Sequence, residues 1–246
     1  TTLLNKILSE KHGKKYAVVV NEFGEVGIDN ELIISSEEEV FEMNNGCICC
    51  TVRGDLIRIL GGLMKRADKL DAIIVETTGL ADPAPVAQTF FVDQDVSDRT
   101  KLDAIVTVAD AVHLSSQLGE HHEAEEQIAF ADVVLLNKID LVDDKAVENV
   151  QIRIRKINPY AKIIKTNHCS APLTEVLGLN AFSLDRVLEV EPDFLESDHD
   201  HEHDDDVTSL SFVSDTPLDM DKFQTWFGNL LQEKGQDILR SKGILN

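Results

Sequence analysis

The stretch DVVLLNKID, residues 132 to 140, joins an unbroken apolar run to a short polar sequence. Such a run indicates a strand that is covered on both faces, as in a parallel sheet flanked by helices. Four similar runs occur in the chain: YAVVVN (16–21), DAIIVE (71–76), DAIVTVAD (103–110) and AKIIKT (161–166). Because the runs alternate with helical patterns, we predict an α/β fold with a mostly parallel, doubly wound sheet.

Helical patterns fill the intervals between these runs. TTLLNKILSEKHG (1–13) has apolar residues at helical spacing from its first positions, and residues 52–67 repeat apolar side chains at i, i+4, i+7 and i+8. A third pattern covers 145–157 and stops before Asn158-Pro159, because proline disfavours a helical conformation in the residue before it. We expect these helices to cover the faces of the sheet.

The residues that finish each apolar run are candidate site residues, because ligands of doubly wound sheets lie beyond the carboxyl ends of the strands. After DVVLL come Asn137, Lys138, Ile139 and Asp140, an NKxD sequence. The Asp140 carboxylate can accept two hydrogen bonds from the N1 and N2 edge of guanine, a pairing that adenine does not offer. Asn137 would brace the loop, and the Lys138 stem would cover the ring. Taken alone, the four residues could also be an ordinary polar turn.

A second strand end leads from DAIIV into Glu76-Thr77-Thr78-Gly79. An acid at this point can hold the water shell of a magnesium ion. A glycine three residues later lets its N–H approach a terminal phosphate without a Cβ in the way. A capping acid followed by a turn glycine would give the same pattern. Together with NKxD, the pattern favours a nucleotide site.

Three of the four cysteines lie close together, at Cys47, Cys49 and Cys50. Their thiolates can converge on one soft metal ion if Gly46 eases the turn. A disulfide is disfavoured, because adjacent cysteines are poorly placed for an unstrained bridge. Zinc or copper(I) suits sulfur ligands best, with cobalt and nickel left open. We therefore predict a metal site at this triplet.

A structural zinc ion normally has four protein ligands, so the triplet leaves one position to fill. Glu25, His113 and water are the candidates for that position. Cys169 lies far from the triplet in the sequence and is interpreted as a packed thiol. Three further histidines alternate with acids and could gather zinc weakly or form part of a solvated segment: His199, His201 and His203.

The composition excludes several functional classes. The 246 residues include 23 basic and 45 acidic side chains, for a formal net charge of −22. That charge would repel a nucleic-acid backbone. The sequence shows no run long enough to span a membrane and no secretory signal at its start. We expect a cytoplasmic protein without a nucleic-acid or membrane partner, an organellar or nuclear location being compatible with the same features.

A very acidic stretch separates two predicted domains. Residues 191–206 carry nine acids and no lysine or arginine, and the SDHDHEHDDD part of the stretch is too polar to form a core. We predict an α/β nucleotide-binding domain at 1–190, a linker at 191–206 and the truncated start of a smaller α+β domain at 207–246.

The predicted second domain begins with LSFVSD (210–215), a strand pattern, and continues with MDKFQTWFGNLLQEKG (220–235), an amphipathic helix pattern. The apolar side of this helix is expected to be buried and consists of Phe223, Trp226, Phe227, Leu230 and Leu231.

Six segments occur in a characteristic order: TTLLN (1–5), NEFGEVGID (21–29), NGCICC (45–50), ETTGLADPAPV (76–86), NKID (137–140) and INPYA (157–161). Together they resemble the CobW family of P-loop GTPases, specifically its zinc-chaperone group. The similarity covers nearly the whole chain, and the combination of CxCC, ExxG and NKxD is very specific. The resemblance implies a P-loop NTPase-like fold. In the family the glycines and lysine of the phosphate-binding loop precede TTLLN, outside this sequence.

The resemblance assigns the phosphate side of the nucleotide site. Thr1 matches the Ser/Thr whose hydroxyl binds Mg²⁺, and Thr2 follows it at the nucleotide. Glu76 would share the magnesium ion with Thr1, and Gly79 would sense the γ-phosphate. Asp29, in a segment that resembles a switch, is a further expected magnesium contact.

The resemblance also selects zinc for the cysteine site and places Cys50 close to both metal and nucleotide. A further guanine-contacting loop is expected at Ser170-Ala171. Nucleotide and metal sites would then share moving parts, since loops that are held by the γ-phosphate relax when it leaves.

The predicted function is a GTP-hydrolysing zinc metallochaperone that uses GTP, Mg²⁺ and Zn²⁺ and couples GTP binding and hydrolysis to transfer of zinc to a client metalloprotein. The resemblance also suggests a client, since eukaryotic zinc-chaperone relatives serve a methionine aminopeptidase through an N-terminal motif; that motif is not present in this sequence, so this enzyme is only one candidate client, and a homo-oligomer is left open. Two alternatives remain: a GTPase for cobalt insertion or nitrile hydratase activation, and a non-enzymatic zinc buffer.

Overall fold

The computed structural model describes residues 1–10, 13–21, 39–43, 50–65, 67–79, 81–119, 121–195, 216–235 and 238. The strands are β1 (Tyr16–Asn21), β2 (Glu39–Met43), β3 (Ala72–Glu76), β4 (Val106–Asp110), β5 (Val133–Asn137) and β6 (Lys162–Lys165). The helices are α1 (Thr2–Ser9), α3 (Cys50–Met64), α4 (Pro83–Val92), α5 (Gln94–Ser97), α6 (Leu114–Gln117), α7 (His122–Ala129), α8 (Asp144–Ile157), α9 (Leu184–Val190) and α10 (Met220–Lys234). Short 3₁₀ turns are η1 (Ala67–Lys69), η2 (Ile139–Leu141) and η3 (Leu173–Glu175).

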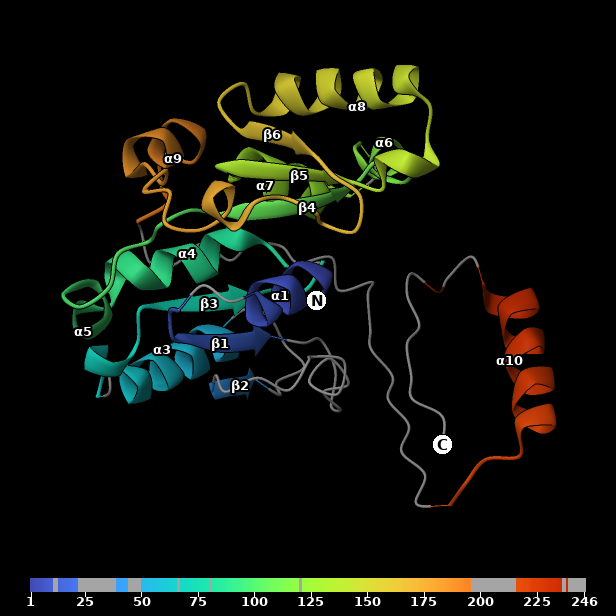
Figure 1. Cartoon of the computed structure of the whole chain (residues 1–246), viewed down its shortest axis with the longest axis horizontal. Helices are drawn as coiled ribbons and strands as arrows, with labels where there is room; N and C mark the ends of the chain where they lie inside the picture. The colour runs from blue at the N-terminus through green and yellow to red at the C-terminus, as the bar shows by residue number, and fades with distance from the viewer. Residues whose placement is uncertain are drawn as a thin grey trace.

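The described strands form two three-stranded parallel sheets, with the orders β2-β1-β3 and β4-β5-β6. Figure 1 shows the strands of both sheets running in the same direction, with their carboxyl ends on the side where the chain begins. We expected one sheet. The division arises because β3 and β4 each pair with only one neighbour among the described strands. All pairs of described strands are parallel, as the alternation of strand and helix patterns predicted.

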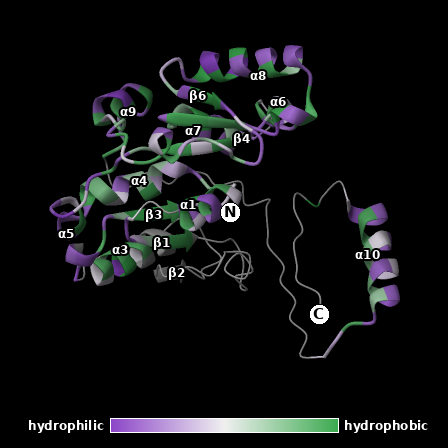
Figure 2. Cartoon of the chain, viewed as in Figure 1, coloured by the Kyte–Doolittle hydropathy of each residue, from purple (hydrophilic) through white to green (hydrophobic). Residues whose placement is uncertain are grey.

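Hydrophobic burial explains the two central strands. Every residue of β5 is buried, as are residues 16–20 of β1. Figure 2 shows both strands in the hydrophobic colour. The strands at the divide are less covered, and Val108 of β4 is 47% exposed. A strand covered on both faces is encoded by a continuous apolar run, and for β1 and β5 that prediction is confirmed.

Helices cover the first sheet on both faces. Val18 and Val20 of β1 pack against Leu4 and Leu8 of α1, while the alternate residues of β1 face α3. The α3 side chains in that cluster include Leu56, Leu60 and Leu63. The predicted amphipathic helix is thus confirmed, but it begins at Cys50 rather than after the cysteines.

One face of the second sheet packs on α6, α7 and α8 through residues that include Ala109, Val134 and Leu136. Leu136 of β5 and Ile154 of α8 share one cluster, and Leu3 of α1 contacts the opposite face next to Leu135. Helix α1 therefore touches both sheets. Helix α4 also reaches across, because Ala84 packs in a cluster with Phe130, at the end of α7.

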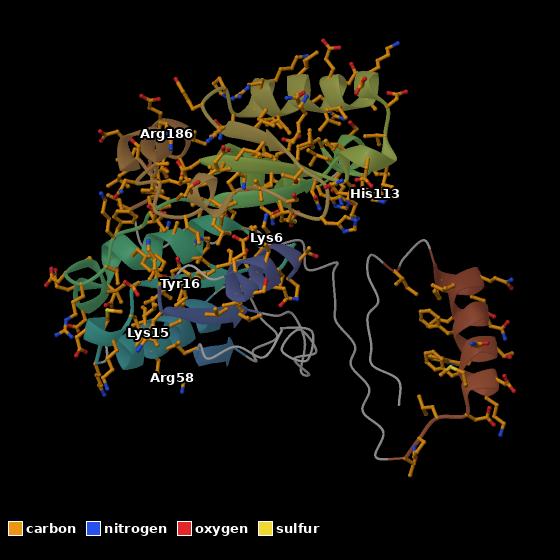
Figure 3. The ribbon with its side chains drawn as sticks, in the orientation of Figure 1. Lys6, Lys15, Tyr16, Arg58, His113 and Arg186 are labelled. Atoms are coloured by element: carbon orange, nitrogen blue, oxygen red, sulfur yellow. The ribbon has the colours of Figure 1, made fainter. Side chains whose placement is uncertain are left out.

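Charged side chains fix several ends of the elements. Asp82 caps α4 by accepting the Ala84 N–H, and Pro83 sits at the first position of the helix. Arg186 of α9, labelled in Figure 3, pairs with the buried Asp132 before β5. Burial raises the pKa of Asp132 above its usual value, and the Ile105 N–H and Arg186 offset only part of that rise.

Two further expectations need correction. The predicted strand 103–110 begins only at Val106, because the Asp103 carboxylate instead accepts N–H groups from the 178–180 loop. The aromatic side of α10 was expected to be buried, yet no residue of this helix is buried and Trp226 is 53% exposed. Phe223 and Phe227 stack on each other instead, with ring centroids 5.7 Å apart. The spacing identified the apolar face correctly but not what would cover it.

No helix in the described part of the chain is long and apolar enough to cross a bilayer. The predicted strand at 210–215 and the histidines of the acidic stretch lie outside the described residues.

Candidate functional site

Asn137, the last residue of β5, is buried and braces the loop after β6. Its side-chain oxygen accepts hydrogen bonds from the Thr166 hydroxyl at 3.1 Å and from the Cys169 N–H at 2.9 Å. A buried amide needs such partners, because an unpaired polar atom in a core is destabilising. Asn137 therefore joins two loops at the carboxyl rim of the second sheet.

Lys138 turns the chain sharply, with a left-handed backbone at φ 61°, so that Asp140 follows in the η2 turn and is exposed. The Lys138 ammonium donates to Asp110 Oδ2 at 2.7 Å. Burial raises the pKa of Asp110, but hydrogen bonds from Lys138 and the Val112 N–H and the charges of Lys138 and His113 outweigh it, so the pKa lies below its usual value. Lys138 is thus held along the rim, beside the end of β4.

The segment after β6 carries two consecutive left-handed residues, His168 (φ 47°) and Cys169 (φ 53°). Such backbone is uncommon for residues other than glycine and persists where the surroundings hold it. Asn137 holds the Cys169 N–H, and Lys6 projects from α1 (Figure 3) and donates to the Ala171 carbonyl at 2.6 Å. The predicted guanine loop at Ser170-Ala171 consequently lies against α1.

Cys169 is buried, as its interpretation as a packed thiol predicted. Burial raises the pKa of this thiol, and the Leu3 N–H and the charge of Lys6 offset only part of the rise. Cys169 therefore stays a neutral thiol near neutral pH and is a poor metal ligand.

Glu76, the last residue of β3, lies beside the start of α1. The Thr1 amino group donates to Glu76 Oε1, and the Thr1 hydroxyl lies 3.5 Å from the same oxygen. Two buried side-chain oxygens in the described part of the chain have no hydrogen-bond partner, Glu76 Oε2 and Thr78 Oγ1. Unsatisfied buried oxygens are available to a ligand, and carboxylate and hydroxyl oxygens are the donors that Mg²⁺ prefers. The residues present therefore fit a magnesium ion at Thr1 and Glu76.

The loop after Glu76 is held by a residue that the sequence analysis missed. Gln127 of α7 donates from its side-chain amide to the carbonyls of Gly79 at 3.1 Å and Ala81 at 2.8 Å. Lys6 and Asp110 were missed as well. The Asp-Pro pair before α4 is a capping signal that could have been found. Nothing in the sequence marks Gln127 or Lys6, because their partners lie 46 or more positions away.

Family comparison accounts for this set of strand ends. The family model described as "CobW/HypB/UreG, nucleotide-binding domain" matches residues 1–165. The chain belongs to this family. A second model, the cobalamin synthesis protein cobW C-terminal domain, matches residues 207–246. The resemblance to the CobW family is thereby confirmed.

Two relatives match the whole of this chain and more than two thirds of their own length. The Escherichia coli protein named zinc chaperone YjiA is 35% identical over 100% of this chain and 77% of its own. The Schizosaccharomyces pombe protein named zinc-regulated GTPase metalloprotein activator 1 is 35% identical over 100% of this chain and 69% of its own. A crystal structure described as the Zn(II)-bound YjiA GTPase from E. coli aligns with a TM-score of 0.58 and 28% identity, covering 96% of this chain and 74% of that one.

The predicted metal-binding segment of this CobW-family chain is described only at its end. Cys50 begins α3. The other candidate ligands Cys47, Cys49 and Glu25, like the expected magnesium contact Asp29, lie outside the described residues. Within the described ranges, no group of three or more His, Cys, Asp or Glu side chains could hold a metal ion.

The histidines near the rim are exposed. His113 caps α6 at the end of the second sheet (Figure 3) and lies close enough to Asp110 to lower its pKa. His122 begins α7 with its side chain 82% exposed and lies 3.0 Å from Glu126. His122 is therefore helix surface and shows no sign of metal binding among the described residues.

Proposed function

We propose that this protein is a GTP-hydrolysing zinc metallochaperone, in which GTP binding and hydrolysis change the affinity for a zinc ion that is passed to a client metalloprotein. One observation supports the proposal most directly. Glu76 lies beside Thr1 at the start of α1, and the loop that Asn137 holds after β6 contacts Lys6 of the same helix, so the two strand ends meet at one rim. The names of the relatives support zinc as the cargo.

The guanine end is assigned to the NKID sequence. Asp140 is exposed and would accept the N1 and N2 hydrogens of guanine. The Lys138 stem, anchored at Asp110, would lie over the ring, and Asn137 keeps the loop in place. Ser170-Ala171 would complete the base pocket, since Lys6 fixes the Ala171 carbonyl.

The phosphate end is assigned to Thr1, Thr2, Glu76 and Gly79. Thr1 and Glu76 would hold Mg²⁺, which when bound supplies positive charge to the phosphates. Gly79 is exposed and has nothing within 4 Å of where a Cβ would stand, so its backbone is open to a γ-phosphate. Asp29 is proposed as a further magnesium contact. Positioning and charge neutralisation provide most of the catalysis in reactions of this class.

The cargo site is assigned to Cys47, Cys49 and Cys50, with Glu25, His113 or water as the fourth ligand. Cys50 at the start of α3 would link the metal to the nucleotide. We further propose that residues 1–190 form the GTPase domain, 191–206 a linker and 207–246 the start of a second domain. A cytoplasmic location and a methionine aminopeptidase client are part of the same proposal.

The deciding experiment measures zinc affinity of the whole protein with a non-hydrolysable GTP analogue, with GDP and without nucleotide. We expect the affinities to differ by about 5-fold or more, in line with typical coupling between sites. Parallel GTPase assays with zinc, cobalt and nickel would distinguish the cargo metal. Identical zinc affinities in all three nucleotide states would contradict the coupling.

A matched deletion separates the tight site from weak binding. Removal of residues 197–206 should lower the number of loosely bound zinc ions and leave the tight site at the cysteines unchanged. Replacement of Cys47, Cys49 and Cys50 by serine should abolish the tight site and leave the number of loosely bound zinc ions unchanged. Loss of the tight site in the deletion variant would contradict the assignment to the cysteines.

A further inference from the structure

Gln127 connects the second sheet to the loop that follows Glu76. Its amide group donates to the Gly79 carbonyl at 3.1 Å and to the Ala81 carbonyl at 2.8 Å. Both donors of one side-chain NH₂ group are therefore used on a single loop. A side-chain amide is the neutral group that can donate twice in this way, whereas a carboxylate in its place would repel both carbonyls.

Hydrogen bonds fix the end of α7, from which Gln127 projects. The Thr107 hydroxyl of β4 donates to the Gln127 carbonyl at 2.7 Å. Immediately after Gln127, the Asn158 side-chain nitrogen lies 2.8–2.9 Å from the carbonyl oxygens of Ile128, Ala129 and Ala131, which share its two N–H donors at the end of α7. Gln127 thus projects from a helix that is tied to β4 on one side and to the end of α8 on the other.

The far end of the connection needs such support. Glycine has the widest backbone freedom of any residue, and its ordering costs the most conformational entropy. Gly79 is exposed, while Ala81 is only 2% exposed and Asp82 caps α4. Gln127 therefore fixes the free side of a loop whose other side is already anchored by α4.

We propose that Gln127 is a positioning residue for GTP hydrolysis, which holds Gly79 in the orientation that meets the γ-phosphate. The inference deepens the proposed function and rests on it. Gly79 is assigned to the γ-phosphate alone, so the Gln127 contact matters for GTP turnover and not for binding of GDP. Because Gln127 belongs to the elements that lead into the NKID strand, the contact also ties the phosphate loop to the guanine side.

The test uses Gln127→Met, which keeps the length and packing of the side chain but removes both donors, alongside Gln127→Glu. Gln117→Met, at an exposed position on α6, is the matched control. We expect kcat for GTP to fall about 10-fold or more in Gln127→Met and further in Gln127→Glu, because misplaced reacting groups lower rates strongly. The dissociation constant of GDP should stay within about 2-fold and the melting temperature within a few degrees.

The outcomes separate the inference from the function on which it rests. Unchanged kcat in Gln127→Met, with normal turnover in the wild type, would overturn the positioning role and leave the proposed function intact. A parallel loss of kcat, GDP affinity and melting temperature would also overturn it, because the contact would then be only structural. All variants are made in the whole protein, and lack of GTP turnover in the wild-type whole protein would overturn the proposed function and this inference together.

Discussion

The two sheets end at one rim, but the polar side chains at their carboxyl ends differ in how many hydrogen-bond partners they have. At the end of the second sheet, Asn137 and Lys138 are bound by Thr166, Cys169 and Asp110. At the end of the first sheet, Glu76 keeps one buried oxygen without a partner. The proposed guanine side is therefore supported by its own hydrogen bonds, whereas the proposed phosphate side keeps a buried carboxylate oxygen available to a ligand. Mutations on the two sides should therefore have different effects: loss of GDP affinity on the guanine side and loss of GTP turnover on the phosphate side.

The largest expected effect lies on the guanine side, at Asp140. Asp140→Asn removes the charged acceptor of two hydrogen bonds, each with a net contribution of about 1.5–3 kcal/mol. GDP should bind about 100-fold more weakly or worse, as measured by calorimetry. Xanthosine diphosphate should now bind better than GDP, because the asparagine amide can donate to the oxygen that replaces the guanine amino group. Asp144→Asn, exposed in the first turn of α8, is the control. An unaltered preference for GDP would contradict the assignment of Asp140 to the guanine base.

The next effect concerns the phosphate side. Glu76→Gln keeps the shape of the side chain and removes its charge, so GTP turnover should fall roughly 100-fold, as for loss of a key electrostatic group. GDP affinity measured without magnesium should change little. Asp71→Asn, just before the opposite end of β3, is the control, since an asparagine oxygen can still accept from the Lys15 N–H. If Glu76→Gln weakened GDP without magnesium as much as Asp140→Asn does, the proposed separation of the two ends would be wrong.

A smaller effect tests the internal support of the guanine side. Thr166→Val deletes the hydroxyl that donates to Asn137 and leaves only the Cys169 N–H on that oxygen. A neutral hydrogen bond contributes about 0.5–1.5 kcal/mol, so GDP affinity should fall roughly 2- to 10-fold. GTP turnover at saturating GTP should stay near normal. Thr174→Val, at an exposed site, should have no effect. Equal losses from both valine variants would show that Asn137 needs no such support.

The smallest effect is a difference in acid stability. The pKa of Asp110 is lowered in the folded chain, so its carboxylate stabilises the fold above the usual aspartate pKa of about 3.9, and this contribution is lost as pH falls through the lowered value. The free energy of unfolding of Asp110→Asn should therefore fall less steeply than that of the wild type below about pH 4, as measured by urea titrations followed by circular dichroism. Parallel curves for the two proteins would indicate that the Lys138 pair contributes nothing to folding.

The strand ends and their motifs could be predicted from the sequence, because a covered parallel strand is a continuous apolar run and its last residues must face the ligand rim. This is why NKID and Glu76 are recognisable as candidate site residues in the sequence alone. The helix pattern at 220–235 is recognisable too, but its aromatic side is not buried among the described residues. Periodicity identifies an apolar face and says nothing about its partner.

Only the tertiary structure decided which groups hold the site. Lys138 meets Asp110 at 28 positions' distance, Asn137 meets Cys169 at 32 and Gln127 meets Gly79 at 48. Strand register brings such pairs together, and a polar residue on a helix gives no local sign of a carbonyl far along the chain. The identity of the polar residues at the rim can therefore be read from local sequence motifs. The position of their side chains depends on how α1, α4 and α7 connect the two sheets.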